Sequence, residues 1–360
     1  MSSTGILWRA VLLLLVGCAT ILCFICSDCW LLVFDFLAPS QLGLEIALIN
    51  RRFDFYVDEH FKTRKWKLNK QFIIQWDIEE NGTNQMQIVK SNGNPLPIPQ
   101  NPLPSKVIGL RGIQILYIDL NVIAFLRRFR RIFAICAIDL DIFTENVRVL
   151  DYFFLNIWPM FHDTIHVLML NTVIFRHFRQ LAPSLLSDCP SLRYVSFNDA
   201  ILPAFPPDES ANASDGQVVV KWLFTPRPDG MPKWLKFSVN SPDQWSSTIE
   251  QLKMAFSNAS SPVTFCIFLR FSSTLIDSVV PFDRMNEMTV EKLTLQQEDE
   301  DVWLTRCPIG WDQRKWLNVK DAFLNDDPQN PIRFLIRDGG FDEGLLLDAA
   351  SPGPSDQQQK

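Results

Sequence analysis

Short apolar runs and helix-like stretches alternate along most of the chain. The apolar runs, which we expect to form strands, cover residues 113–118, 137–142, 166–171, 192–197, 235–239 and 263–271. Most of them begin about 25 to 30 residues apart, a period that is typical of solenoid repeats. One strand and one helix in each period would build a parallel sheet backed by helices. Its buried strand residues should include Ile113, Ile115, Leu168, Leu170 and Val195.

Two segments in the middle of the chain, residues 167–171 and 185–195, resemble divergent leucine-rich repeats. A proline-rich stretch between residues 198 and 234 interrupts the period and contains a helix-like segment at 214–224. We therefore expect residues 68–345 to form an irregular, leucine-rich-repeat-like interaction domain of the α/β or α+β class. The alternative is an α/β domain in which strands and helices alternate without a true repeat.

The flanking segments are predicted from the same kinds of pattern. Strand-like stretches at 71–78 and 85–90 are separated by a turn pair, Asn81-Gly82. Prolines between residues 95 and 104 favour an extended linker on the surface. Another strand is expected at 290–295. The tail, residues 346–360, should be disordered, because its Ser, Pro, Gly, Asp and Gln residues cannot offset the entropy of ordering.

The N-terminus carries a long apolar run. No charged residue occurs between Ala10 and Cys26, Arg9 precedes the run, and small residues suited to signal-peptide cleavage follow at 17–19. Residues 1–26 are therefore predicted to be a signal peptide or a membrane anchor, with a spurious extension as a third interpretation. Glycosylation sequons that begin at Asn81, Asn212 and Asn258 do not decide the compartment, because a chain of this length carries a few by chance.

Residues 27–67 show the pattern of three short helices. Ser27 or Asp28 can cap the first helix, Pro39 ends it and starts the second, and the third begins near Asn50. The apolar positions of these helices are Leu31, Phe34, Leu37, Leu42, Ile46, Ile49, Phe53 and Val57. Helices this short bury little surface by themselves, so the segment should pack on a partner or on the neighbouring domain.

Leu31, Val33, Phe34, Leu37, Pro39, Leu42 and Ala47 match the apolar pattern of the F-box, and the segment resembles that family. Trp30, Ile49 and Phe53 depart from the family's residues but keep apolar bulk. The resemblance implies contacts with the Skp-family adaptor of a cullin-RING ubiquitin ligase. The implied adaptor-binding residues are Trp30, Leu31, Val33, Phe34, Leu37, Pro39, Leu42, Ile49 and Phe53. The alternative is that these residues form only the core of a helical cap on the larger domain.

A second resemblance covers more of the chain. Residues 95–100 with 106–109, and Trp303-Leu304 with residues 306–309, are similar to F-box-type proteins from plant-parasitic nematodes. This resemblance also implies an F-box followed by an interaction domain.

Charge argues against nucleic acid as a partner. The net charge is −6 and the isoelectric point is near 5.3, whereas nucleic-acid binders use Lys and Arg to displace counterions from phosphates. Basic clusters do occur at Lys62 to Lys70 and at Arg127 to Arg131. We interpret them as solvated faces or partner contacts.

The chain contains no motif that would indicate catalysis or a cofactor. The phosphate-binding loop, the dinucleotide-binding glycine pattern and the nucleophile elbow are all absent from the sequence. His162 and His166 have metal-like spacing but lack the glutamate of a zinc protease, and we expect ordinary histidines there. The eight cysteines show no disulfide framework, and we expect mostly buried thiols. Cys23, Cys26 and Cys29 give two overlapping C-x-x-C spacings, but no second Cys or His pair follows at the distance of a zinc finger, and we expect no metal there.

These patterns predict a non-enzymatic substrate receptor of an SCF-type ubiquitin ligase. The F-box would bind the adaptor, and through it a cullin, while the C-terminal domain would bind a target protein that the sequence does not identify. Such a receptor would be cytoplasmic or nuclear. The alternative is a secreted or membrane-anchored, effector-like interaction module without a role in a ligase.

Overall fold

The computed structural model describes residues 26–35, 37, 42, 46–63, 66–78, 84–90, 96–97, 107–133, 138–144, 146–271, 279–298, 301–311, 314 and 331–337. Residues 1–25 of the expected signal or anchor segment lie outside this set, and so does the expected tail, 346–360. Within the described ranges, no helix is both long enough and apolar enough to span a membrane. The chain divides into two compact units, Met1–Trp66 and Lys67–Lys360, which we call the helical unit and the α/β unit.

Two helices form the described framework of the helical unit: α3 (Ser27–Phe34) and α5 (Arg51–Thr63). Asn50 fixes the start of α5, because its Oδ1 accepts hydrogen bonds from the backbone N–H groups of Arg52 at 2.9 Å and of Phe53 at 3.1 Å. Between the helices, the Ala47 N–H donates to the Leu42 carbonyl at 2.8 Å, which closes a wide turn. Much of the expected second helix, including Pro39, lies outside the described residues.

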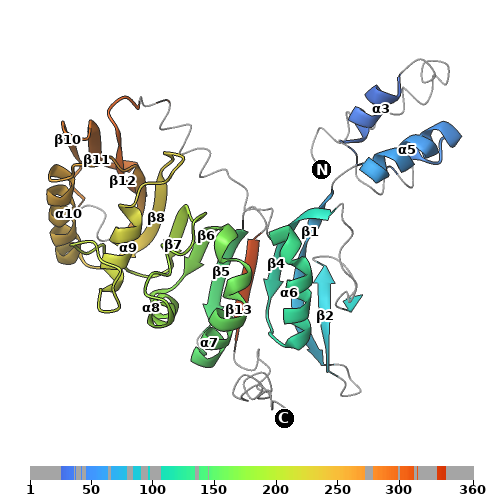
Figure 1. Cartoon of the computed structure of the whole chain (residues 1–360), viewed down its shortest axis with the longest axis horizontal. Coiled ribbons are helices and arrows are strands. Elements are labelled where there is room, and N and C mark those ends of the chain that lie inside the picture. Colours follow the sequence, from blue (N-terminus) through green and yellow to red (C-terminus); the bar gives the residue numbers. More distant parts are fainter. Residues whose placement is uncertain are drawn as a thin grey trace, which may run out of the picture. The chain divides into compact units, whose positions relative to one another are not determined.

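The α/β unit is built on one mixed sheet of thirteen described strands, in the order β10-β11-β12-β9-β8-β7-β6-β5-β13-β4-β1-β2-β3 (Figure 1). The strands are β1 (Trp66–Ile78), β2 (Asn84–Lys90), β3 (Leu96–Pro97), β4 (Val107–Ile115), β5 (Ile138–Thr144), β6 (Ile165–Leu170), β7 (Tyr194–Phe197), β8 (Lys233–Val239), β9 (Phe265–Phe271), β10 (Phe282–Asn286), β11 (Glu291–Glu298), β12 (Asp301–Pro308) and β13 (Pro331–Ile336). The expected class, a mixed α/β protein with a large sheet, is confirmed.

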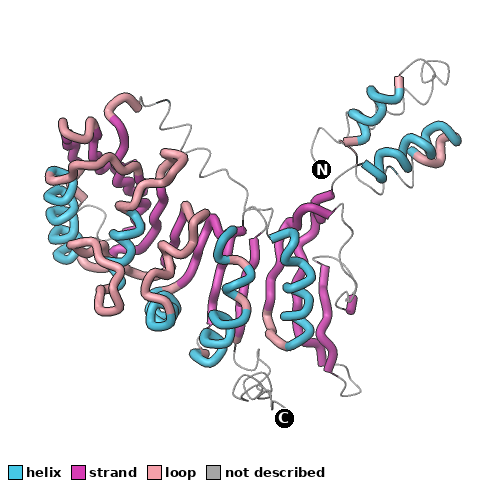
Figure 2. The backbone as a smooth tube through the Cα atoms, in the orientation of Figure 1, coloured by secondary structure: helices cyan, strands magenta, loops and turns pink. Residues whose placement is uncertain are grey.

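A helix follows each of the strands β4 to β8. Two short 3-10 turns also lie between α7 and β6. The helices are α6 (Leu120–Phe133), α7 (Val147–Asn156), α8 (Thr172–Leu181), α9 (Asp215–Leu223) and α10 (Pro242–Ser257), and the turns are η2 (Trp158–Met160) and η3 (His162–Thr164). Figure 2 shows this alternation of strand and helix. Strands β5 to β9 are parallel neighbours in chain order, because a helical crossover returns the chain to the same end of the sheet each time.

The parallel arrangement expected from the strand-helix repeats holds for the middle of the sheet but not for its two ends. The two strands expected on either side of the Asn81-Gly82 turn pair are antiparallel, as such a turn favours. Strands β12, β11 and β10 continue antiparallel from β9, and β2 and β3 are antiparallel at the other edge. The β10–β12 region is joined by short connections that leave no room for a helix, so successive strands must reverse direction. Leu96–Pro97, expected in a surface linker, pairs with β2 as the last strand in the order, where a proline removes no ladder hydrogen bond that the sheet needs.

The last described strand, β13, was not predicted, and it lies between β4 and β5. It pairs in parallel with both neighbours, so that Ile332 is opposite Ile113 on one side and Leu140 on the other. Phe334 is fully enclosed and meets Phe153 of α7 edge to face, with ring centroids 4.7 Å apart. The C-terminal part of the chain therefore joins the early strands of the sheet to the later ones.

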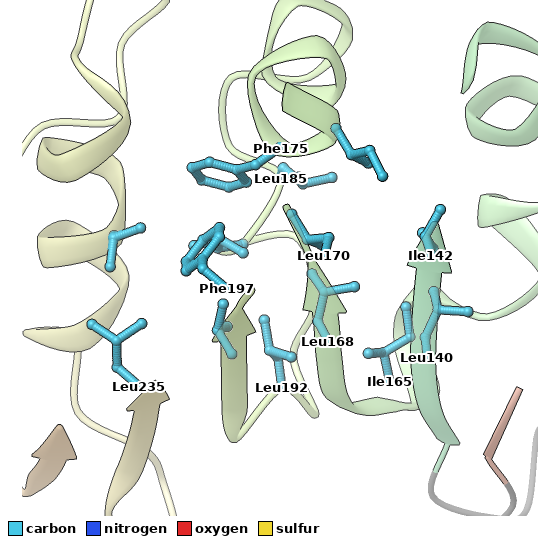
Figure 3. Packing of buried hydrophobic residues seen from close by; sticks show 14 of the residues in the cluster. Leu140, Ile142, Ile165, Leu168, Leu170, Phe175, Leu185, Leu192, Phe197 and Leu235 are labelled. Carbon is cyan, nitrogen blue, oxygen red and sulfur yellow. The ribbon is translucent and has the colours of Figure 1, made fainter. Parts of the chain in front are cut away.

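The main core lies between the sheet and helices α6 to α10. Leu140, Leu168 and Leu170 point from neighbouring strands toward Phe175 and Leu185 above them (Figure 3). The strand residues expected to be buried, Ile113, Ile115, Leu168, Leu170 and Val195, are each 1% exposed or less. That prediction is confirmed.

Polar caps explain where three of these helices begin. Asn146 and Asn171 accept backbone N–H groups at the starts of α7 and α8. At α9, the Ser214 side chain and the Gln217 side chain form a reciprocal capping box. The helix expected at 214–224 is therefore confirmed, with its cap at the first of these residues.

Lys233 places a cation beside the core and gives the fold a testable pH dependence. Its Nζ donates to the Trp222 carbonyl at 2.6 Å and lies 4.9 Å from the Trp222 ring centroid. Burial lowers the pKa of Lys233 to about 8, whereas an unfolded lysine titrates near 10.4. Between these two values the unfolded chain binds more protons, so the free energy of unfolding should rise with pH.

We expect wild-type protein to gain on the order of 2 kcal/mol relative to Lys233→Met between about pH 7 and pH 10. Urea unfolding at a series of pH values measures this difference. The exposed Lys221 provides the matched control, and Lys221→Met should keep the wild-type rise. An equal rise in Lys233→Met would show that another group is responsible.

Candidate interaction surfaces

The expected adaptor-binding residues lie mostly inside the helical unit. Its core consists of Trp30, Phe34, Leu37, Leu42, Ile46, Phe53 and Val57. The Trp30 and Phe53 rings meet edge to face at 4.8 Å, and Phe34 meets the buried His60 ring in the same way at 5.6 Å. Leu31, Val33 and Ile49 are half-buried against this core, and Pro39 lies outside the described residues. The unit thus uses Phe34 and Leu37 for its own packing, and the assignment of these residues to an adaptor stays a prediction.

Other apolar side chains of this unit face solvent. Leu32 is 65% exposed on α3, Leu48 is 76% exposed in the turn before α5, and Phe55 is 59% exposed on α5. We call these three residues the exposed apolar set. Helix α3 has apolar side chains on nearly every side after Cys29, which is typical of a helix that is covered on more than one face. This distribution of apolar residues around the helix could have indicated from the sequence that Leu32 is a candidate contact residue. The prediction considered a single amphipathic face of the helix and therefore left Leu32 out.

Charged and polar side chains surround Phe55 on α5. Lys62 pairs with Glu59 at 2.7 Å, and the Arg52 Nε donates to the Tyr56 hydroxyl at 2.7 Å. An apolar contact with a charged rim is the usual composition of a protein–protein interface. The arrangement can therefore support docking of another protein.

The α/β unit has a second, smaller apolar cluster on the sheet face that points away from the helices. It contains Trp234, Cys266 and Trp303, with Tyr194 and Phe268 packed against them. All five come from the adjacent strands β7, β8, β9 and β12, at positions that alternate with the residues of the main core. No helix among the described elements contributes to this cluster, which we call the strand-face cluster. Trp303 is 2% exposed, so its ring packs inside this cluster and not on the surface.

Basic side chains flank the strand-face cluster. Lys236 is half-buried next to Phe268, with its Nζ 5.1 Å from the ring centroid. Burial, and then the neighbouring Arg270, lower the pKa of Lys236. Arg270 itself is exposed at the adjacent position of β9. Trp234, Cys266 and Trp303 are themselves buried, and of the cluster only Tyr194 and Phe268 are partly exposed. The accessible part of this face therefore combines two partly exposed aromatic rings with the two basic side chains, a composition that suits an acidic protein segment.

The structure places the two histidines of metal-like spacing in different elements. His162 lies in η3 beside Asp163 at 3.2 Å, whereas His166 lies within β6, and so the two are not on one helical turn. Among the described residues, no group of histidine, cysteine and carboxylate side chains is placed to hold a metal ion. Among the described cysteines, Cys189, Cys266 and Cys307 are buried, as expected for most of the thiols, whereas Cys26 and Cys29 are exposed.

Comparison of the chain with protein-family models, with curated proteins and with solved structures found no match. The resemblances to the F-box, to its nematode relatives and to leucine-rich repeats therefore stay predictions from the sequence.

Proposed function

We propose that this protein is a substrate receptor of an SCF-type ubiquitin ligase. The helical unit would bind a Skp-family adaptor, and the adaptor would connect the receptor to a cullin. The α/β unit, as an irregular leucine-rich-repeat-like domain, would bind the target protein. The receptor would hold the target near the ubiquitin-charged enzyme without transferring any group itself.

The exposed apolar set carries this proposal. A unit that has its own apolar core and still exposes Leu32, Leu48 and Phe55 leaves surface that a partner can remove from water. The division of the chain at residue 66 lets that unit serve docking while the sheet serves recognition. On the sheet, we assign to the target the partly exposed Tyr194, Phe268 and Lys236 together with the exposed Arg270, at the edge of the strand-face cluster.

Capture of a Skp-family adaptor by the immobilised full chain tests the role of the exposed apolar set. Burial of each such side chain contributes about 1.5 to 3 kcal/mol, so the triple variant Leu32→Ser, Leu48→Ser, Phe55→Ser should weaken capture by more than about 100-fold. A control triple variant, Val173→Ser, Met254→Ser, Met288→Ser, changes equally exposed apolar residues of the α/β unit and should bind like wild type. Equal capture by both triple variants would exclude this surface.

The alternative function is a secreted or membrane-anchored interaction protein, effector-like and without a ligase role. It predicts that neither wild type nor any variant captures the adaptor.

A further inference from the structure

Two exposed cysteines stand together at the start of α3. Cys26 is the residue that precedes the helix, and Cys29 lies in its first turn. Their Sγ atoms are 3.3 Å apart, close enough for one thiol to donate a hydrogen bond to the other. A disulfide requires the sulfurs to approach to about 2.05 Å. Because the remaining movement is only about 1 Å, rotation of the side chains can close it without unwinding the helix.

The two thiols are not equivalent. The backbone N–H of Cys29 and then its thiol lower the pKa of Cys26 below the ordinary cysteine value, an effect that the nearby Asp28 carboxylate opposes. The same thiol contact raises the pKa of Cys29. A cysteine at the start of a helix in a C-x-x-C spacing is commonly the more acidic of the pair, since the free N–H groups there stabilise a thiolate. Cys26 is thus the better nucleophile toward a disulfide, and Cys29 is placed to attack the Cys26 sulfur afterwards.

We propose that Cys26 and Cys29 form a reversible dithiol–disulfide site that reacts with low-molecular-weight disulfides. In the first step the Cys26 thiolate attacks one sulfur of the small disulfide, forms a mixed disulfide and releases one small thiolate. In the second step Cys29 loses its proton and attacks the Cys26 sulfur, which releases the second small thiolate. The two protein thiols are oxidised to one disulfide, and the small disulfide is reduced to two thiols.

The buried cysteines differ from this pair in their exposure to solvent. Cys189, Cys266 and Cys307 are enclosed in the α/β unit, and burial raises the pKa of Cys189 to about 12. Burial should keep their sulfurs out of reach of small disulfides while the protein is folded. They provide internal controls within the same chain.

The test treats the folded full chain with oxidised glutathione, blocks free thiols by alkylation and maps the cysteines by mass spectrometry. We expect a disulfide between Cys26 and Cys29 that a dithiol reductant reverses, while Cys189, Cys266 and Cys307 become alkylated only after unfolding. In Cys29→Ser, the second step is removed, so Cys26 should accumulate as a stable mixed disulfide with glutathione. In Cys26→Ser, reaction of the remaining thiol should slow by about tenfold or more.

Three results would overturn the proposal. One is a disulfide that joins Cys26 to Cys18 or Cys23 instead of Cys29. Another is the absence of a mixed disulfide in Cys29→Ser, and the third is reaction of Cys26 and Cys29 no faster than the buried cysteines. Each readout follows thiol chemistry alone, so it does not depend on whether the protein binds an adaptor.

Discussion

Replacing Arg306 with alanine is expected to lower the free energy of unfolding of the α/β unit by about 3 to 5 kcal/mol. Arg306 and Glu291 are both completely buried. The Arg306 Nε and Nη2 donate to Glu291 Oε2 at 3.0 Å and 2.7 Å, and Nη2 also donates to the Ser261 carbonyl at 3.0 Å. Without the arginine, the Glu291 carboxylate would be left charged in the interior with only one remaining donor, the Val263 N–H at 2.7 Å.

Urea unfolding of the full chain measures this effect. Arg284→Ala, which removes an exposed arginine from the nearby strand β10, is the matched control and should change stability by less than about 0.5 kcal/mol. Changing Arg306 and Glu291 together to methionine removes both charges and should cost less than the two single changes added together. A loss below about 1 kcal/mol in Arg306→Ala would mean that the interior tolerates the unpaired carboxylate.

Replacing Phe34 with alanine is expected to unfold the helical unit and, as a consequence, to abolish adaptor capture. Phe34 is wholly buried between the Trp30 ring and the His60 ring. Deleting a buried phenylalanine costs about 3 to 5 kcal/mol, and a unit with so small a core cannot lose that much and remain folded.

Hydrogen exchange of residues 27–63 in the full chain separates this effect from loss of a contact. Phe34→Ala should lose protection throughout α3 and α5, whereas Leu32→Ser, which changes a solvent-facing residue two positions earlier, should keep it. If Phe34→Ala keeps wild-type protection yet fails to bind, then Phe34 contacts the adaptor directly and our assignment to the core is wrong.

The local pattern of apolar residues predicts most of the strands of the central sheet. The alternation of apolar residues along β6 and β7 places Leu168, Leu170 and Val195 on one face, and the structure buries all three. The helix-like pattern at 214–224 also predicted α9 correctly. The start of α9 can be recognised from the sequence as well, because Ser214 and Gln217 have the spacing of a capping box.

The local pattern could not predict which strands lie next to each other in the sheet. The apolar alternation of residues 331–336 is that of a strand, but its insertion between β4 and β5 depends on pairings with residues about 200 positions away in the chain, which no local period records. The same holds for the strand-face cluster, where Trp234 and Trp303 meet only because β8, β9 and β12 are adjacent.

In the helical unit, the amphipathic pattern selected the inward positions. Phe34 and Leu37 are buried and Leu31 is half-buried, whereas Leu32, which the pattern left off the apolar face, is exposed. The pattern could not tell whether that apolar face packs within the unit or on a partner, and only the packing against Trp30, Phe53 and His60 decides this. The proposed docking surface therefore changed from the buried residues to the exposed apolar set.

Calorimetric titration of the purified full chain with a purified Skp-family adaptor shows whether this chain binds such an adaptor at all. We expect a saturable complex of one chain with one adaptor, with a dissociation constant of about 1 μM or tighter, and retention of a cullin by that complex but not by the chain alone. The absence of a detectable complex at adaptor concentrations of about 100 μM, with hydrogen exchange showing that the helical unit is folded, would mean that this chain is not a receptor of an SCF-type ligase.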